Sequence, residues 1–200
     1  MKNPKFETIL KWGCPRVPLT SGLELVVSRE ELQAQIKAAG DRLRYDYQGK
    51  NLTTIAILEG GRYITGQVCS HLPETSTHMP LSIVAKRYGN RTTGNKVDVY
   101  YDWIKDHADE RDKIRERHCL ILDDVLDKGA TAARVIEVVR QFEPASISTL
   151  FMVRKKVQRT VEVQADYVLF DVDDLWLIGA GLDDRGYGRD RPHIACKRPE

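Results

Sequence analysis

One stretch of the chain, residues 120–144, constrains the fold most, because it predicts a strand, a tight loop and a helix in succession. Three apolar residues at 120–122 precede Asp123 and Asp124, and valines then recur at 135, 138 and 139, the spacing of one helix face. We expect the strand to end at the two acids. The helix should begin at Thr131 and end near Glu143, which precedes a proline. This order of elements is typical of α/β proteins.

The loop between this strand and helix has the composition of an anion-binding site. Backbone N–H groups in the first turn of a helix lack partners within the helix, and a glycine lets a ligand approach them, which suits phosphate. Asp123 and Asp124 could accept hydrogen bonds from sugar hydroxyls or hold hydrated magnesium. A solvated turn that binds nothing would also have this composition. The candidate phosphate-binding residues are Lys128, Gly129, Ala130 and Thr131.

The rest of the chain alternates between strand and helix patterns. This favours an α/β fold with a mostly parallel, twisted sheet flanked by helices. A capping box at residues 28–31 begins a helix with an apolar stripe from Leu32 to Tyr47. A second helix is expected at 62–71, and the polar segment 102–117 is expected at the surface. Further strands are expected at residues 23–27, 53–58, 81–85, 97–101, 146–153 and 166–170.

Length and composition narrow the class of protein. A chain of 200 residues that is 42% hydrophobic and 30% charged predicts one domain spanning residues 1–200. A net charge of +2 does not favour a nucleic-acid partner. The four cysteines are far apart and are expected to be reduced thiols. No apolar run has the length of a membrane span and no signal-peptide core is found, so we expect a cytoplasmic protein without a membrane partner.

Residues 123–131, Asp-Asp-Val-Leu-Asp-Lys-Gly-Ala-Thr, resemble the phosphoribosyl pyrophosphate (PRPP) binding motif of type I phosphoribosyltransferases, particularly the hypoxanthine-guanine phosphoribosyltransferases. Lys128 departs from the motif, in which threonine or serine is common. Because the phosphate contacts there are mostly backbone amides, the change affects mainly local charge. The resemblance implies a core at about residues 45–170 and a small hood formed by residues 1–30 and 171–200. A homodimer or homotetramer is expected.

Two further loops resemble loops of this family that surround the leaving pyrophosphate. Residues 57–61 resemble the pyrophosphate loop, which implies a cis peptide between Leu58 and Glu59 and backbone contacts from Glu59 and Gly60. Glu59 departs from the family, which often has lysine there. Residues 86–94 resemble the mobile loop that excludes water from the reacting ribose. The alternatives are a plain glycine turn and a plain basic hairpin. The mobile loop begins with Lys86, Arg87 and Tyr88.

The C-terminal third resembles the purine-binding part of the family. Lys155 matches the lysine that contacts the purine 6-oxygen, Trp176 matches the stacking aromatic, and Leu177 matches a residue with backbone contacts to the base. Asp183 matches the acid linked to the second magnesium on the base side, and Arg189 matches an arginine that meets pyrophosphate. Taken singly, each could instead be a solvated lysine, a packing residue or a surface ion pair.

The resemblance implies a purine phosphoribosyltransferase that joins hypoxanthine or guanine to C1 of PRPP and releases pyrophosphate, with Mg²⁺ as cofactor. Asp127 is the candidate general base or hydrogen-bond acceptor at the purine N7 proton. The candidate magnesium residues are Asp123, Asp124 and Asp183. Two alternatives stay open. One is a phosphoribosyltransferase that prefers xanthine or a pyrimidine, and the other is a catalytically silent PRPP-binding regulator.

Overall fold

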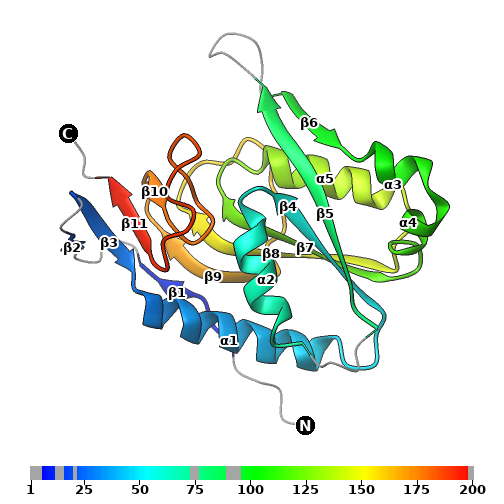
Figure 1. Cartoon of the computed structure of the whole chain (residues 1–200), viewed down its shortest axis with the longest axis horizontal. Coiled ribbons are helices and arrows are strands. Elements are labelled where there is room, and N and C mark those ends of the chain that lie inside the picture. The colour runs from blue at the N-terminus through cyan, green and yellow to red at the C-terminus, as the bar shows by residue number, and fades with distance from the viewer. Residues whose placement is uncertain (1–5, 12–15, 20–21, 73–76, 89–95, 198–200) are drawn as a thin grey trace.

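The main element of the protein is a seven-stranded sheet with the strand order β1-β9-β8-β7-β4-β5-β6 (Figure 1). The computed structural model describes residues 6–11, 16–19, 22–72, 77–88 and 96–197. Neighbouring strands of this sheet are parallel except β5 and β6, which are antiparallel. The strands are β1 (Ile9–Leu10), β4 (Leu52–Leu58), β5 (Met79–Tyr88), β6 (Lys96–Tyr100), β7 (His118–Leu126), β8 (Ser146–Lys155) and β9 (Tyr167–Val172).

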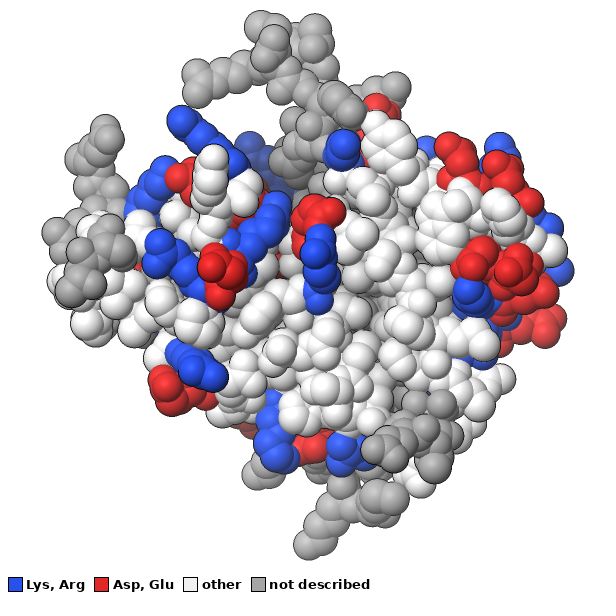
Figure 2. All heavy atoms as spheres, viewed as in Figure 1, with Lys and Arg blue, Asp and Glu red and all other residues white. Residues whose placement is uncertain are grey.

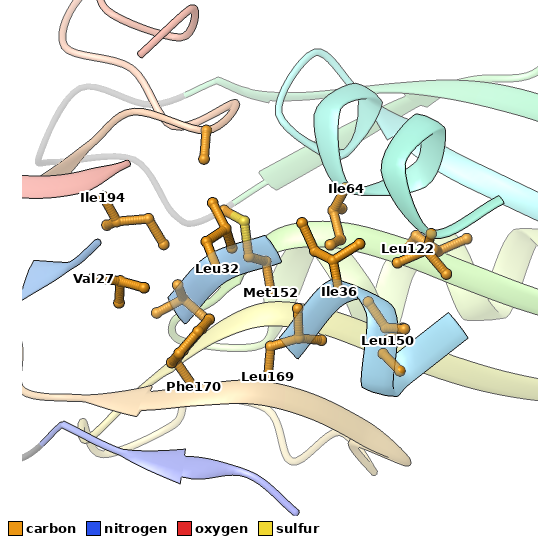
Figure 3. Close-up of a cluster of buried hydrophobic side chains, with 14 of the residues drawn as sticks. Val27, Leu32, Ile36, Ile64, Leu122, Leu150, Met152, Leu169, Phe170 and Ile194 are labelled. Carbon is orange, nitrogen blue, oxygen red and sulfur yellow. The ribbon is translucent and has the colours of Figure 1, made fainter. Parts of the chain in front are cut away.

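Helices cover both faces of this sheet. Side chains alternate along a strand, so successive residues of β7 pack on opposite faces. Leu120 and Leu122 join a buried cluster with α1 and α2, part of which is drawn in Figure 3. Cys119 and Ile121 join a second cluster with α5 on the other face. The helices are α1 (Arg29–Asp46), α2 (Gly61–Cys69) and α5 (Ala130–Arg140). This double cover explains why residues 55–57 of β4 and 119–122 of β7 are apolar and buried.

A smaller four-stranded sheet brings together segments from both ends of the chain. Its strand order is β10-β11-β3-β2, and β3 is antiparallel to both of its neighbours. In Figure 1 this sheet lies beside the carboxyl end of β9. The N-terminal segment is shared between the two sheets, because β1 pairs with β9. The strands of the smaller sheet are β2 (Val17–Pro18), β3 (Leu23–Val27), β10 (Leu177–Ile178) and β11 (Ile194–Lys197).

The predicted mixed α/β fold is confirmed, and pairing between strands changed some predicted ends. The capping box of α1 is present, because Ser28 Oγ accepts from Glu31 N while Ser28 N donates to Glu31 Oε2. The prediction that β7 stops at the two acids was wrong. β7 continues to Leu126 because β8 runs beside it and pairs with it as far as Arg154. Helix α5 ends at Arg140, before the predicted end.

The prediction that residues 102–117 form a surface segment was only partly correct. The segment contains the short helices α3 (Asp102–Asp106) and α4 (Ala108–Asp112), and Ile104 and Ile114 are fully buried in the cluster on the α5 face. Among the described cysteines, Cys69, Cys119 and Cys196 form no disulfide. No helix in the described part of the chain is long and apolar enough to cross a membrane.

Candidate active site

A cavity of about 310 Å³ lies at the carboxyl ends of β4 and β7, the edge at which open α/β sheets bind ligands. In Figure 2, Lys, Arg, Asp and Glu side chains gather on the part of the surface formed by the loop between β10 and β11, which supplies one wall of this cavity. The structure brings eight of the sequence-predicted site residues into the cavity wall. They are Gly60, Asp123, Asp124, Asp127, Gly129, Thr131, Asp183 and Arg189.

Asp123 and Asp124 are the most deeply placed acids of the cavity. Asp123 is only 8% exposed, and its Oδ1 accepts a hydrogen bond from Asp124 N at 3.0 Å. Burial raises the pKa of Asp123 well above its usual range, and the neighbouring Asp124 carboxylate raises it further. Burial also raises the pKa of Asp124, against the lowering effects of its hydrogen bond with Asp123 and of Arg189. The two carboxyl groups are therefore suited to bind a ligand that supplies positive charge or hydroxyl donors.

The glycine loop after β4 makes room for this acid pair. A Cβ atom added to Gly60 would lie 2.0 Å from Asp124 Oδ2, so any other residue there would push this carboxylate aside. The predicted cis peptide between Leu58 and Glu59 is confirmed. The Glu59 side chain is itself exposed and forms an ion pair with Arg62 three residues later, outside the cavity wall. The loop therefore presents its backbone to the cavity.

Asp183 and Arg189 close the side of the cavity formed by the loop between β10 and β11. Arg189 Nη2 lies 2.6 Å from Asp183 Oδ1, and Arg189 Nη1 donates to the Gly181 carbonyl. Asp183 Oδ2 also accepts from Gly186 N at 2.6 Å. The loop packs tightly against the glycine loop, because a Cβ on Gly181 would lie 2.6 Å from the Gly60 carbonyl oxygen. Arg189 therefore pairs with Asp183, and its positive charge also lowers the pKa of Asp124.

The loop from β7 into α5 has the geometry expected of an anion site. Gly129 has a φ of +86°, which favours glycine, and α5 begins at the next residue. Asp127, Gly129 and Thr131 lie in the cavity wall, whereas Lys128 and Ala130 do not. The Lys128 carbonyl instead accepts hydrogen bonds from the connection between β8 and β9. The N-terminal end of α5 therefore faces the same space as Asp123 and Asp124.

Three of the predicted base-binding residues lie outside the cavity wall. Lys155, at the end of β8, has its Nζ 3.5 Å from Asp174 Oδ1. Trp176 is 57% exposed, with Lys197 Nζ 6.0 Å from the centre of its ring. Leu177 is buried in β10. None of these predicted base-binding residues belongs to the described cavity wall.

The residues predicted to begin the mobile loop belong to β5. Residues 86–88 pair with 96–98 of β6, and Lys86 Nζ lies 5.8 Å from the centre of the Tyr100 ring. The loop predicted between them, residues 89–95, lies outside the described residues. The role of Lys86, Arg87 and Tyr88 in closing the site stays a prediction.

Sequence reasoning missed several contributors to this region. Ile57 and Ala85 line the cavity because neighbouring strands β4 and β5 end there, which the order of strands in the sheet determines. Asp174 was missed as the partner of Lys155, since the two are 19 residues apart. Arg62 could have been found, because a cation three residues after Glu59 at a helix start is a common pairing.

Comparison with known proteins identifies the family of the chain. The family model described as phosphoribosyl transferase domain matches residues 23–185. A hypoxanthine-guanine phosphoribosyltransferase of Streptococcus pneumoniae is 27% identical over 88% of this chain and 94% of its own length. One from Bacillus subtilis is 28% identical over 88% and 93%. A crystal structure of a hypoxanthine phosphoribosyltransferase from Staphylococcus aureus superposes with a TM-score of 0.78, at 24% identity, over 90% of this chain and 94% of that one.

Proposed function

Because the chain belongs to the phosphoribosyl transferase domain family, we propose that it transfers the phosphoribosyl group of PRPP to a 6-oxopurine, hypoxanthine or guanine. The observation that carries this proposal is one cavity whose wall combines four aspartates, of which Asp123 is buried, with a helix N-terminus and an arginine. The relatives named hypoxanthine-guanine phosphoribosyltransferase favour this choice of base.

The cavity would hold PRPP by its two anionic ends and its diol. Backbone N–H groups of residues 128–131, with the Thr131 hydroxyl, would receive the 5′-phosphate at the start of α5. The carboxylates of Asp123 and Asp124 would accept hydrogen bonds from the ribose hydroxyls. The backbone at Glu59 and Gly60, with Arg189, would contact pyrophosphate.

The protein side chains would carry out one proton transfer and otherwise bind and orient the substrates. The purine N9 lone pair forms a bond to C1 of the ribose as the bond from C1 to the pyrophosphate oxygen breaks. The N7 proton passes to the Asp127 carboxylate, which makes N9 more nucleophilic. Lys155 would donate to the 6-oxygen, Trp176 would stack on the ring, and Leu177 would offer its backbone to the base edge.

The acid pair also suits the magnesium expected with PRPP. Mg²⁺ is commonly bound at phosphate sites by one or two carboxylates together with substrate oxygens. Asp123 and Asp124 supply such a pair, whereas Asp183 is engaged by Arg189 and Gly186 N. No group of three or more metal-ligating side chains occurs within the described residues, so substrate oxygens would complete the coordination. When bound, the ion would neutralise the leaving pyrophosphate.

A spectrophotometric assay with PRPP, magnesium and each of hypoxanthine, guanine, xanthine and adenine tests the proposal. We expect turnover of hypoxanthine and guanine, and Asp127→Asn should lower kcat by about 10²- to 10⁴-fold. Asp106→Asn, which changes an exposed acid on α3, is the matched control and should turn over like the wild type. No turnover with any purine would refute the proposal. Preference for xanthine would correct the choice of base. The cytoplasmic location and the homodimer or homotetramer stay predictions.

A further inference from the structure

The connection between β8 and β9 is attached to the phosphate loop through one carbonyl group. The Lys128 oxygen accepts hydrogen bonds from Thr160 N at 3.1 Å, from Val161 N at 3.2 Å and from the Thr160 hydroxyl at 3.0 Å. Gly129 permits this close approach, since a Cβ there would lie 2.1 Å from the Val161 carbonyl oxygen. Three donors on one carbonyl are more than a plain surface turn requires.

The direction of this carbonyl fixes the direction of an amide in the cavity wall. In a trans peptide the C=O and the following N–H point in opposite directions. Among the described peptide bonds only Leu58–Glu59 is cis, so the Lys128–Gly129 peptide is trans. With the Lys128 oxygen directed toward Thr160, the Gly129 N–H is directed the other way, and Gly129 lines the cavity. Donors on the oxygen also polarise the peptide, which strengthens its N–H as a donor.

We propose that Thr160 is a positioning residue for PRPP, because its hydroxyl holds the Lys128–Gly129 peptide with the Gly129 N–H directed at the 5′-phosphate. The proposal rests on the proposed function of the cavity and adds a residue that does not itself line the cavity wall. Thr160 is exposed and lies outside every helix and strand, so its hydroxyl is not needed to build the core.

The same connection also begins at the predicted base-binding lysine. The Lys155 carbonyl accepts from Val157 N at 3.1 Å and from Arg159 Nη2 at 3.4 Å. A small apolar cluster, in which Val163 packs beside Leu126 and Ala132, anchors the other end of the connection against the phosphate loop. Loss of the hydroxyl would therefore remove one of the three donors that orient the Lys128 oxygen without releasing the connection from the phosphate loop.

The test compares Thr160→Val, Thr160→Ser and the wild type, with Thr77→Val as the matched control. Thr77 is another exposed threonine whose hydroxyl donates a hydrogen bond, to Asn51 Oδ1, near the amino end of β5 and away from the cavity wall. Loss of one hydrogen bond on the carbonyl should raise the KM for PRPP about two- to tenfold in Thr160→Val. The KM for hypoxanthine should stay within about twofold, and Thr160→Ser and Thr77→Val should match the wild type.

Binding of ribose 5-phosphate, measured by calorimetry on the same proteins, separates this inference from the proposed function. This probe carries the 5′-phosphate and needs no turnover, so it should bind more weakly to Thr160→Val even if no purine is a substrate. Equal affinity in Thr160→Val and the wild type would overturn the inference. An equal rise of both KM values, or a failure of serine to restore the KM for PRPP, would also overturn it.

Discussion

The phosphate side and the base side of the proposed site are built differently. The phosphate side comes mainly from one continuous stretch, residues 123–131, in which Asp123 is buried and Gly129 is enclosed by neighbouring backbone. The base side comes from the end of β8 and from residues 174–177, and its tryptophan is more than half exposed. The phosphate side is thus shaped before any ligand binds, whereas the base side leaves the aromatic face open.

Because of this difference, substitutions on the two sides should affect the activity in different ways. A substitution in an enclosed wall displaces several neighbours at once, because packed interiors have little free space. A substitution in an exposed wall removes only the contact that the side chain itself makes with its ligand. Variants of the phosphate side should therefore affect all turnover, and variants of the base side should affect mainly the affinity for purine.

The largest effect is expected for Gly60→Ala. The new Cβ would lie 2.0 Å from Asp124 Oδ2 and would displace this carboxylate from the cavity wall, so kcat/KM should fall by about 100-fold or more. Gly66→Ala is the matched control, because a Cβ at this position of α2 meets nothing within 4 Å. It should keep its activity and gain about 0.5–1 kcal/mol in the free energy of unfolding. Full activity in Gly60→Ala would show that the wall is not rigid.

Lys155→Met should have the next largest effect. Loss of a charged donor to the 6-oxygen should raise the KM for hypoxanthine by about 10- to 100-fold while leaving the Kd for PRPP near its wild-type value. Steady-state kinetics and calorimetry measure the two quantities. If both constants rise equally, Lys155 has no separate role on the base side.

Trp176→Ala should have a smaller effect on the KM for purine than Lys155→Met. Loss of stacking should raise the KM for purine by about fivefold or more. Trp176→Phe, which keeps an aromatic ring, should have a KM close to that of the wild type. Since the side chain is 57% exposed, the free energy of unfolding should change by no more than about 0.5 kcal/mol. Chemical denaturation of the variant checks this, and a large loss of stability would mean that the ring is a packing residue.

Asp123→Asn should raise the thermal stability of the protein above the pH range in which a free aspartate titrates. Burial raises the pKa of Asp123 in the folded protein, so the wild type loses stability as pH rises from the usual aspartate pKa through the folded value. Asparagine has no charge to bury, so the variant should unfold at a higher temperature at pH 8, by about 2–4 °C per kcal/mol, with no gain near pH 3. Thermal unfolding in a chelator measures this. A lower Tm at pH 8 would contradict it.

The sequence predicted the phosphate side better than the base side for a physical reason. Residues 123–131 are consecutive, so their chemistry and their placement are both encoded locally. Five of the predicted residues of this stretch lie in the cavity wall, whereas the predicted Lys128 and Ala130 do not, and Val125 and Leu126 line it without having been predicted. Lys155, Trp176 and Leu177 were placed by resemblance alone, because their separation depends on how two sheets pack. The end of β7 was mispredicted because pairing with β8 outweighs the local preference of two acids to end a strand.

Calorimetric titration of PRPP with magnesium into the protein, in the absence of any purine, tests most directly the claim that the phosphate side is already formed. The wild type should bind one PRPP per chain. Gly129→Ala should not bind it, because the added Cβ would lie 2.1 Å from the Val161 oxygen and the loop would have to move. Gly66→Ala should bind like the wild type. Binding that requires a purine to be present, or equal binding by Gly129→Ala, would contradict the claim.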